Sequence, residues 1–242
     1  MDPTEITPPL QRRVWLDRLQ AIFEILLMSG VFSSFVAAAP LAIHSRGTEA
    51  LLRSVRTVAS FVLLESGVTF VLLALILRAH GETLADLGLR LNRWRGQILV
   101  GIAIVPCLFL LNALVGGFFR IFLPKYFMER NPLMEIILSP RDLILFITSA
   151  LIAGGVKEEL QRAFIIVRFR QHLGGAWLGL VLWSMAFGAG HYVQGLQGMV
   201  VAGLFGLVFG AVYVLRANLI GPMISHGLYD ALALLGYWYF RG

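Results

Sequence analysis

Six ionisable residues lie inside or beside strongly apolar segments in the second half of the sequence: Glu158, Glu159, Arg162, His191, His226 and Asp230. An ionisable side chain at the centre of a membrane-spanning helix costs about 2.5–3.5 kcal/mol, so such residues usually face the interior of a bundle and pair with one another. A carboxylate base, two imidazoles and another polar group suffice to activate water and to hold the oxyanion formed when water attacks an amide. The sequence therefore predicts a polar site inside a helical bundle.

The first group of residues is Lys157-Glu158-Glu159-Leu160-Gln161-Arg162. Residues four apart share a helix face, so the spacing predicts an ion pair between Glu158 and Arg162. Glu159 points about 100° away and meets a different environment. The alternative is that the preceding span ends at Val156 and that these charges begin a solvated helix.

The other two groups carry the histidines. His191 closes the apolar run LGLVLWSMAFGAGHY, in which Phe187 lies one turn earlier. His226 and Asp230 share a helix face after Pro222, and His226 is the predicted partner of Asp230. The alternatives are a hydrogen-bonded packing histidine at position 191 and a structural His226–Asp230 pair.

The composition predicts an integral membrane protein. Hydrophobic residues make up 58% of the 242 residues, against roughly 45–50% in soluble domains, and the mean hydropathy is +0.79. Apolar runs approach the length of about 20 residues that crosses a bilayer as a helix. Seven spans are predicted at about 20–43, 57–79, 98–119, 143–169, 176–193, 195–215 and 217–240, with an eighth interfacial or re-entrant piece in 120–140.

The predicted fold class is all-α: a polytopic transmembrane bundle of seven to eight spanning helices with a polar site buried in its C-terminal half. We expect a single integral membrane domain over residues 1–242, with a polar tail at 1–19 and the core of the site at 143–235. Loops on the side of the N-terminus carry more Lys and Arg than those on the other side, which favours a cytoplasmic N-terminus.

Several features are interpreted as structural. Residues 80–97 are expected to lie on the membrane surface as a short amphipathic stretch. Gly206 and Gly210 are expected to allow close helix contact. Cys107 is expected to pack as a small hydrophobe. The net charge of +6 is attributed to loop arginines, so no nucleic-acid partner is expected.

With these residues in view, the chain resembles the CAAX-protease and bacteriocin-processing family (CPBP or Abi), which includes the Ras-converting CAAX endopeptidases. The family pattern is a Glu-Glu pair followed by an arginine, then Phe-x-x-x-His, then His-x-x-x-Asn or a close relative. The matching positions are Glu158-Glu159 with Arg162, Phe187-x-x-x-His191, and His226-x-x-x-Asp230. They cover roughly residues 143–235.

Two departures from this pattern affect the interpretation. Two residues, and not three, separate the Glu pair from Arg162, so an alternative register sets Lys157 at the position of the first Glu. The Glu158-Glu159 register is preferred because a lysine cannot serve as the carboxylate base. Asp230 replaces the commoner Asn, and an ionised carboxylate cannot donate to an oxyanion, so Asp230 must be protonated or must orient His226.

The resemblance implies an intramembrane endopeptidase. Glu158 with His191 would activate the attacking water, and His226 with Asp230 would steady the oxyanion or the leaving group. No cofactor is expected; zinc is the alternative, with Glu158, His191 and His226 as its ligands. The implied partners are the lipid bilayer and a peptide or protein substrate, lipidated or not, and the expected location is the bacterial cytoplasmic membrane.

Two other functions remain open. A non-catalytic member of the same fold, with an immunity or scaffold role, is compatible with the shifted arginine and with Asp230. A proton- or ion-coupled transporter is compatible with buried Glu, His and Asp, although the sequence shows no pair of repeated halves.

Overall fold

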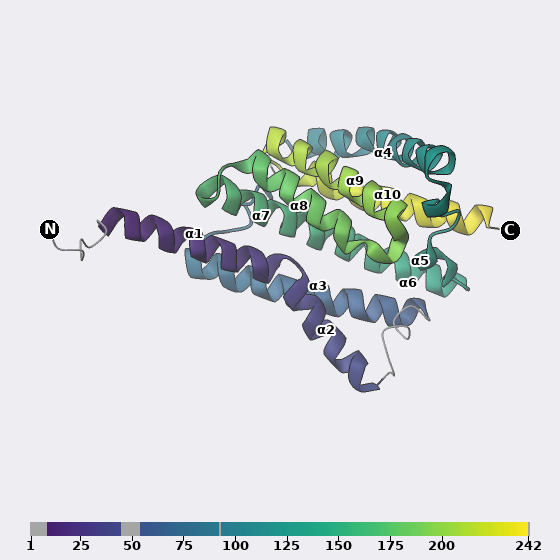
Figure 1. The fold of residues 1–242 in the computed structure, drawn as a ribbon, viewed down its shortest axis with the longest axis horizontal. Helices are drawn as coiled ribbons and strands as arrows, with labels where there is room; N and C mark the ends of the chain where they lie inside the picture. Colours follow the sequence, from purple (N-terminus) through teal and green to yellow (C-terminus); the bar gives the residue numbers. More distant parts are fainter. Residues whose placement is uncertain (1–8, 45–53, 92, 242) are drawn as a thin grey trace.

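The structure, a computed structural model, describes residues 9–44, 54–91 and 93–241 (Figure 1). These residues form helices and no strand, which confirms the predicted all-α class. The elements are α1 (Pro9–Met28), α2 (Val31–His44), α3 (Val55–His80), α4 (Trp94–Phe122), η2 (Pro124–Tyr126), α5 (Pro132–Glu135), α6 (Pro140–Ala150), η3 (Leu151–Glu158), α7 (Glu159–His172), α8 (Ala176–Gly190), η4 (Tyr192–Gln194), α9 (Gly195–Arg216) and α10 (Ile220–Phe240).

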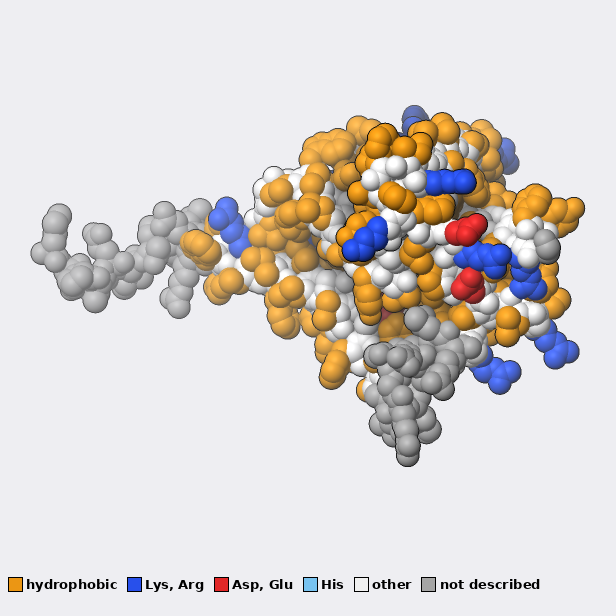
Figure 2. Space-filling view, turned by 45° about the vertical axis from the view of Figure 1, so that its right-hand side comes forward, with side chains coloured by type: hydrophobic (Ala, Val, Ile, Leu, Met, Phe, Trp, Pro, Cys, Tyr) orange, Lys and Arg blue, Asp and Glu red, His pale blue; other side chains and the backbone are white. Residues whose placement is uncertain are grey.

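Four helical stretches of the described chain are long and apolar enough to cross a membrane: Arg13–Pro40, Val55–His80, Trp94–Phe122 and Tyr192–Arg216. Many large apolar side chains on these helices are exposed, among them Phe35, Val71 and Ile121. Figure 2 shows hydrophobic side chains over much of the visible surface, with Lys, Arg, Asp and Glu mostly toward one end. A surface of this kind is suited to lipid, so the molecule is a membrane protein.

The other three predicted spans are present as helices of different character. Segment 143–169 is divided into α6, the π-helix η3 and α7. Helix α8 is apolar but has only 15 residues, fewer than the roughly 20 needed to cross the hydrocarbon core as a straight helix. Helix α10 has 21 residues and contains His226 and Asp230. The motif residues themselves therefore make these segments less apolar or less regular.

Two segments before or between the spans differ from expectation, and a third, predicted as an interfacial or re-entrant piece, contains only short helices. Helix α1 begins at Pro9, inside the predicted polar tail; residues 1–8 lie outside the described chain. Residues 81–91 form turns, with Leu87 fully buried and Leu91 exposed, and the next helix starts only at Trp94. Residues 123–138 contain the short η2 and α5 and no spanning helix.

Helix α7 lies at the centre of the bundle. Every residue from Glu159 to Arg168 is buried, so the helix has no exposed face over this stretch. Phe164, Ile165 and Ile166 pack in one core with residues of α1, α3, α8 and α9. This central position places the Glu-Glu-x-x-Arg sequence inside the molecule, away from lipid.

Helices α8 and α9 approach each other closely through small residues. A Cβ on Gly188 would lie 2.6 Å from the carbonyl oxygen of Met199, and one on Gly206 would lie 3.2 Å from Ser184 Oγ. Gly210 faces Leu180 in the same way. These contacts confirm the predicted packing role of Gly206-x-x-x-Gly210, and they fix the end of α8, where His191 lies, against α9.

Candidate active site

The first part of the site is the junction between the π-helix η3 and α7. π-Helical segments are rare in proteins, and those that occur often lie at functional sites. Gly154 lies in this segment, where a Cβ would be 2.5 Å from Asp230 Oδ2 and 3.0 Å from His226 Nε2. A side chain at this position would displace the Asp230 carboxylate and crowd the His226 ring. The Gly154-Gly155 pair therefore allows the first and third motifs to come together.

The two adjacent glutamates have different surroundings. Glu158 lines a cavity, with Oε2 3.7 Å from His226 Nε2 and Oε1 3.6 Å from Lys157 Nζ. Glu159 is fully buried behind it, where it pairs with Arg162 and hydrogen-bonds His226 Nδ1 at 2.8 Å. The prediction that the two carboxylates meet different environments is confirmed.

The predicted Glu158–Arg162 pair is wrong: Arg162 pairs with Glu159, three residues before it. The π-helical winding ends at Glu158 and turns its carboxylate toward α10, whereas Glu159 begins regular α-helix. The guanidinium carbon of Arg162 lies 4.9 Å from the ring of Phe187 and 5.5 Å from that of Phe209. Arg162 is thus held between α8 and α9 and fixes Glu159 in turn.

His226 is oriented by a carboxylate from another helix. Its Nδ1 lies 2.8 Å from Glu159 Oε1, and because an ionised carboxylate can only accept, Nδ1 carries the proton. Its Nε2 lies 3.7 Å from both Glu158 Oε2 and Asp230 Oδ2. The ring stacks on Phe209 with centroids 4.7 Å apart. The predicted partner Asp230 is therefore close to His226, but Glu159 makes the direct hydrogen bond.

His191 follows the last residue of α8. Its Nδ1 lies 2.8 Å from the carbonyl oxygen of Phe187, so this nitrogen donates to the backbone. The imidazole also packs on the Phe187 ring, with centroids 4.5 Å apart. Both histidines are therefore anchored through Nδ1, which leaves Nε2 of each as the nitrogen available to a ligand.

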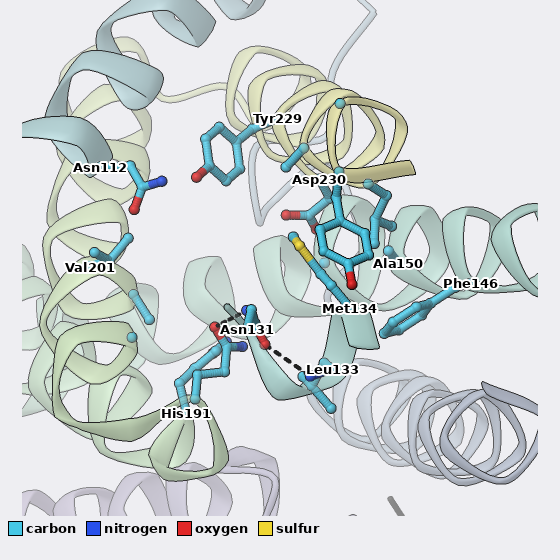
Figure 3. A pocket seen from close by; sticks show the side chains of 18 of the residues that line it. Asn112, Asn131, Leu133, Met134, Phe146, Ala150, His191, Val201, Tyr229 and Asp230 are labelled. Atoms are coloured by element: carbon cyan, nitrogen blue, oxygen red, sulfur yellow. Dashed lines mark hydrogen bonds between the residues drawn. The ribbon is translucent and has the colours of Figure 1, made fainter. Parts of the chain in front are cut away.

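One cavity joins these groups. It has a volume of about 1190 Å³ and is lined by Glu158, His191, His226 and Asp230, but not by Glu159 or Arg162. Figure 3 shows Asp230 and Tyr229 on α10 and His191 on the opposite side of the space. The lining also contains amide side chains: Asn131 donates to Gln194 Oε1, and Gln197 Oε1 accepts from the backbone of Met128.

The sequence interpretation missed two groups of residues. Glu65 of α3 is buried and lies 2.9 Å from Lys157 Nζ, so Lys157 joins Glu65 and Glu158. A lone acid in the apolar run FVLLESGVTFVLL was a visible signal for this partner. The amides Asn131, Gln194 and Gln197 gave no such signal, because polar uncharged residues in a connecting segment or at the start of a span are ordinary.

Zinc, with Glu158, His191 and His226 as its ligands, stays an alternative prediction. Among the described residues, no group of three or more His, Cys, Asp and Glu side chains is positioned to hold a metal ion. His226 uses Nδ1 on Glu159, and its Nε2 is 3.7 Å from the Glu158 carboxylate.

Residues 139–232 match the family model described as "Rce1-like: Type II CAAX prenyl endopeptidase Rce1-like". The matched stretch runs from the residue that caps α6 into α10 and contains all three motifs. No curated protein and no solved structure matches the chain. Residues 139–232, which carry the three motifs, are therefore similar to the Rce1-like CAAX endopeptidases, in line with the resemblance noted in the sequence.

Proposed function

We propose that the protein is an intramembrane endopeptidase of the CAAX type in which Glu158 activates the attacking water. One observation carries the proposal: Glu158, His191 and the His226–Asp230 pair come from three separate segments, yet they line one cavity. General acid–base catalysis requires a base and its partners within reach of the same water. Residues 143–235 supply this catalytic core, and the location we propose is the bacterial cytoplasmic membrane.

Glu158 serves as the general base. Its ionised carboxylate takes a proton from water, and the resulting hydroxide attacks the carbonyl carbon of the scissile peptide bond. His191 binds the same water through Nε2, because Nδ1 is occupied by the Phe187 carbonyl. When the C–N bond breaks, Glu158 returns the proton to the leaving amine, so that it ends the cycle ionised.

His226 holds the oxyanion of the tetrahedral intermediate. In its protonated form it donates from Nε2, while Nδ1–H stays bound to Glu159. Asp230, as a carboxylate 3.7 Å from Nε2, orients the imidazole and does not itself donate to the oxyanion. Glu159 and Arg162 are positioning residues, since both are buried behind the cavity.

The substrate is a peptide or protein segment that reaches the cavity from the membrane. The lining offers the amide side chains Asn131, Gln194 and Gln197, which can bind the polar backbone of an extended peptide. The apolar part of the lining, which includes Leu133, Phe146 and Val201, suits an apolar side chain or a lipid group.

The test measures cleavage by the full chain reconstituted in lipid nanodiscs. A mixed peptide library is supplied in matched prenylated and unmodified forms, and products are read by mass spectrometry. Glu158→Gln and His191→Ala are expected to lower the rate of cleavage by about 10²–10⁴-fold. Asp17→Asn and His172→Ala are matched controls, because both residues lie away from the cavity.

Full cleavage by both Glu158→Gln and His191→Ala would end the proposal and favour a non-catalytic role for the same fold. A second arm adds a zinc chelator to the wild-type protein. Unchanged cleavage supports the metal-free mechanism, and a loss that added zinc reverses contradicts it.

A further inference from the structure

A second cavity lies away from the candidate active site, between the start of α4 and the end of α9. Its volume is about 420 Å³. It is lined by Arg90, Arg93, Gln97, Leu215, Arg216, Ala217 and Asn218. This lining contains three arginines and no acidic residue, and it shares no residue with the larger cavity.

Buried amides hold two of the arginines in place. Gln97 is buried, and its Oε1 accepts from Arg216 Nε at 3.0 Å. Asn218 is also buried, and it donates to the backbone oxygen of Arg90 at 3.0 Å. Arg90 Nε donates to the carbonyl of Ala85 at 2.8 Å. Each guanidinium is thus fixed through Nε, which leaves its terminal nitrogens for a ligand.

The backbone of the cavity is held in an unusual conformation at two points. Arg93 and Ala217 both have positive φ, of 54° and 48°, although neither is a glycine. Such residues cost free energy and persist only where the surrounding structure requires them. Arg93 also precedes the first turn of α4 without giving it a side-chain hydrogen bond. The positive end of the α4 dipole therefore adds to the positive field of the arginines.

The cavity lies at the level of the lipid head groups. The apolar stretch Trp94–Phe122 begins at this point and the stretch Tyr192–Arg216 ends there. Trp94 is exposed and carries Arg95 over its ring at 5.3 Å, an arrangement common at the membrane interface. In Figure 1, α4 runs from its bluer N-terminal end to its teal C-terminal end near α5. The start of α4, which lines this cavity, and α5, which lines the larger one, therefore lie toward opposite ends of the bundle.

We propose that this cavity binds the phosphate of an anionic membrane lipid. Arginine side chains match phosphate oxygens in a two-pronged geometry, and basic pockets between spanning helices suit anionic head groups. A soluble phosphate has the same chemistry. A lipid is favoured because the site lies where two spans end, so acyl chains can continue along the exposed apolar faces of α4 and α9.

The experiment uses the purified full chain in a neutral detergent. The probes are phosphatidylglycerol and phosphatidylcholine with identical acyl chains, and bound lipid is quantified by native mass spectrometry. We expect wild-type protein to bind phosphatidylglycerol more tightly. Removing an arginine is expected to weaken this binding by about fivefold, and Arg93→Gln with Arg216→Gln together by about 25-fold.

The matched control is Arg120→Gln with Arg141→Gln, which removes the same charge from exposed positions outside the cavity. Arg93→Gln alone provides a variant that disturbs no hydrogen bond within the described chain, in case the double variant does not fold. Equal loss in the control and cavity variants would overturn the proposal, as would equal binding of the two lipids. A third arm adds inorganic phosphate: displacement of the lipid at equal concentration would indicate a site for a soluble anion instead.

Discussion

Helix α7 and the π-helix η3 before it contain two buried clusters of charged residues. The clusters differ in how many of their polar atoms have hydrogen-bond partners. At the far end of α7, Arg168 binds Glu24 at 2.7 Å and Glu82 at 2.7 and 2.9 Å, and its guanidinium packs on Phe164. At its start, Glu159 Oε2 and two nitrogens of Arg162 have no hydrogen-bond partner within the described chain.

This difference in hydrogen-bond partners distinguishes a structural cluster around Arg168 from a candidate reactive cluster around Glu158. Helices α1 and α7 and the turn at Glu82 are joined through Arg168, and its donors are used by protein groups. The groups near Glu158 instead face a cavity, with Nε2 of His226 at 3.7 Å from two carboxylates and bonded to neither. An imidazole nitrogen beside a cavity that has no partner in the protein can hydrogen-bond to a substrate or to water.

The largest effect is expected from Arg168→Met, which leaves Glu24 and Glu82 without their partner. Removing one member of a buried pair costs about 3–5 kcal/mol of folding free energy. Arg170→Met is the matched control; that residue is exposed, so the change should stay within about 0.5 kcal/mol. Denaturant unfolding in detergent measures both. Equal stabilities would show that the Arg168 cluster is not structural.

Glu159→Gln tests the positioning of His226. An amide can present its NH₂ group to Nδ1 and so fix the wrong tautomer, and we expect cleavage to fall by about 10²-fold. The rate of the folded protein is measured in nanodiscs beside Glu82→Gln, which affects only the other cluster. A comparable fall in both variants would remove the distinction between the two clusters.

Gly154→Ala tests the contact between η3 and α10. The added Cβ would lie 2.5 Å from Asp230 Oδ2 and 3.0 Å from His226 Nε2, so these two side chains must shift, at a cost of about 1–3 kcal/mol. Gly67→Ala is the control, because nothing lies within 4 Å of its Cβ position, and in mid-helix it should stabilise by about 0.5–1 kcal/mol. Thermal melting measures both; a neutral Gly154→Ala would contradict the close packing.

The smallest effect is a pH dependence at the structural cluster. Hydrogen bonds from Arg168 hold the pKa of Glu82 below its usual value of 4.5. Glu82 therefore stabilises the fold above that pH, and its contribution is lost as the pH falls through the lower pKa of the folded state. We expect the stability difference between wild type and Glu82→Gln to be about 1 kcal/mol at pH 7. It should shrink as the pH falls below 4.5.

The sequence predicted the helical class and the residues that line the main cavity, because charges inside apolar runs are conspicuous. Glu158, His191, His226 and Asp230 could be selected from their position alone. The sequence could not predict which of the charged residues pair with one another. The i,i+4 spacing favoured Glu158 with Arg162, but the π-helix ends between the two glutamates and changes which one faces the cavity.

Partners from distant helices were beyond local spacing rules. Glu24 meets Arg168 from 144 residues away, and Glu159 meets His226 from 67 residues away. Nothing in the periodicity of α1 or α10 specifies these contacts, which depend on how the helices pack. Glu24 and Glu65 were nevertheless visible as single acids in apolar segments, so their burial with a basic partner could have been expected.

The enclosure of α7 bears on how the protein is assembled. This helix carries Glu159, Arg162, Arg168 and Arg170 within 14 residues, and it is not among the stretches apolar enough to span a membrane unaided. Because each such charge opposes entry into lipid, α7 should be retained in the bilayer only after its neighbours have been synthesised. We therefore expect α7 to insert stably only after α8 and α9 have been synthesised. The cavity would then form late in the biogenesis of the protein.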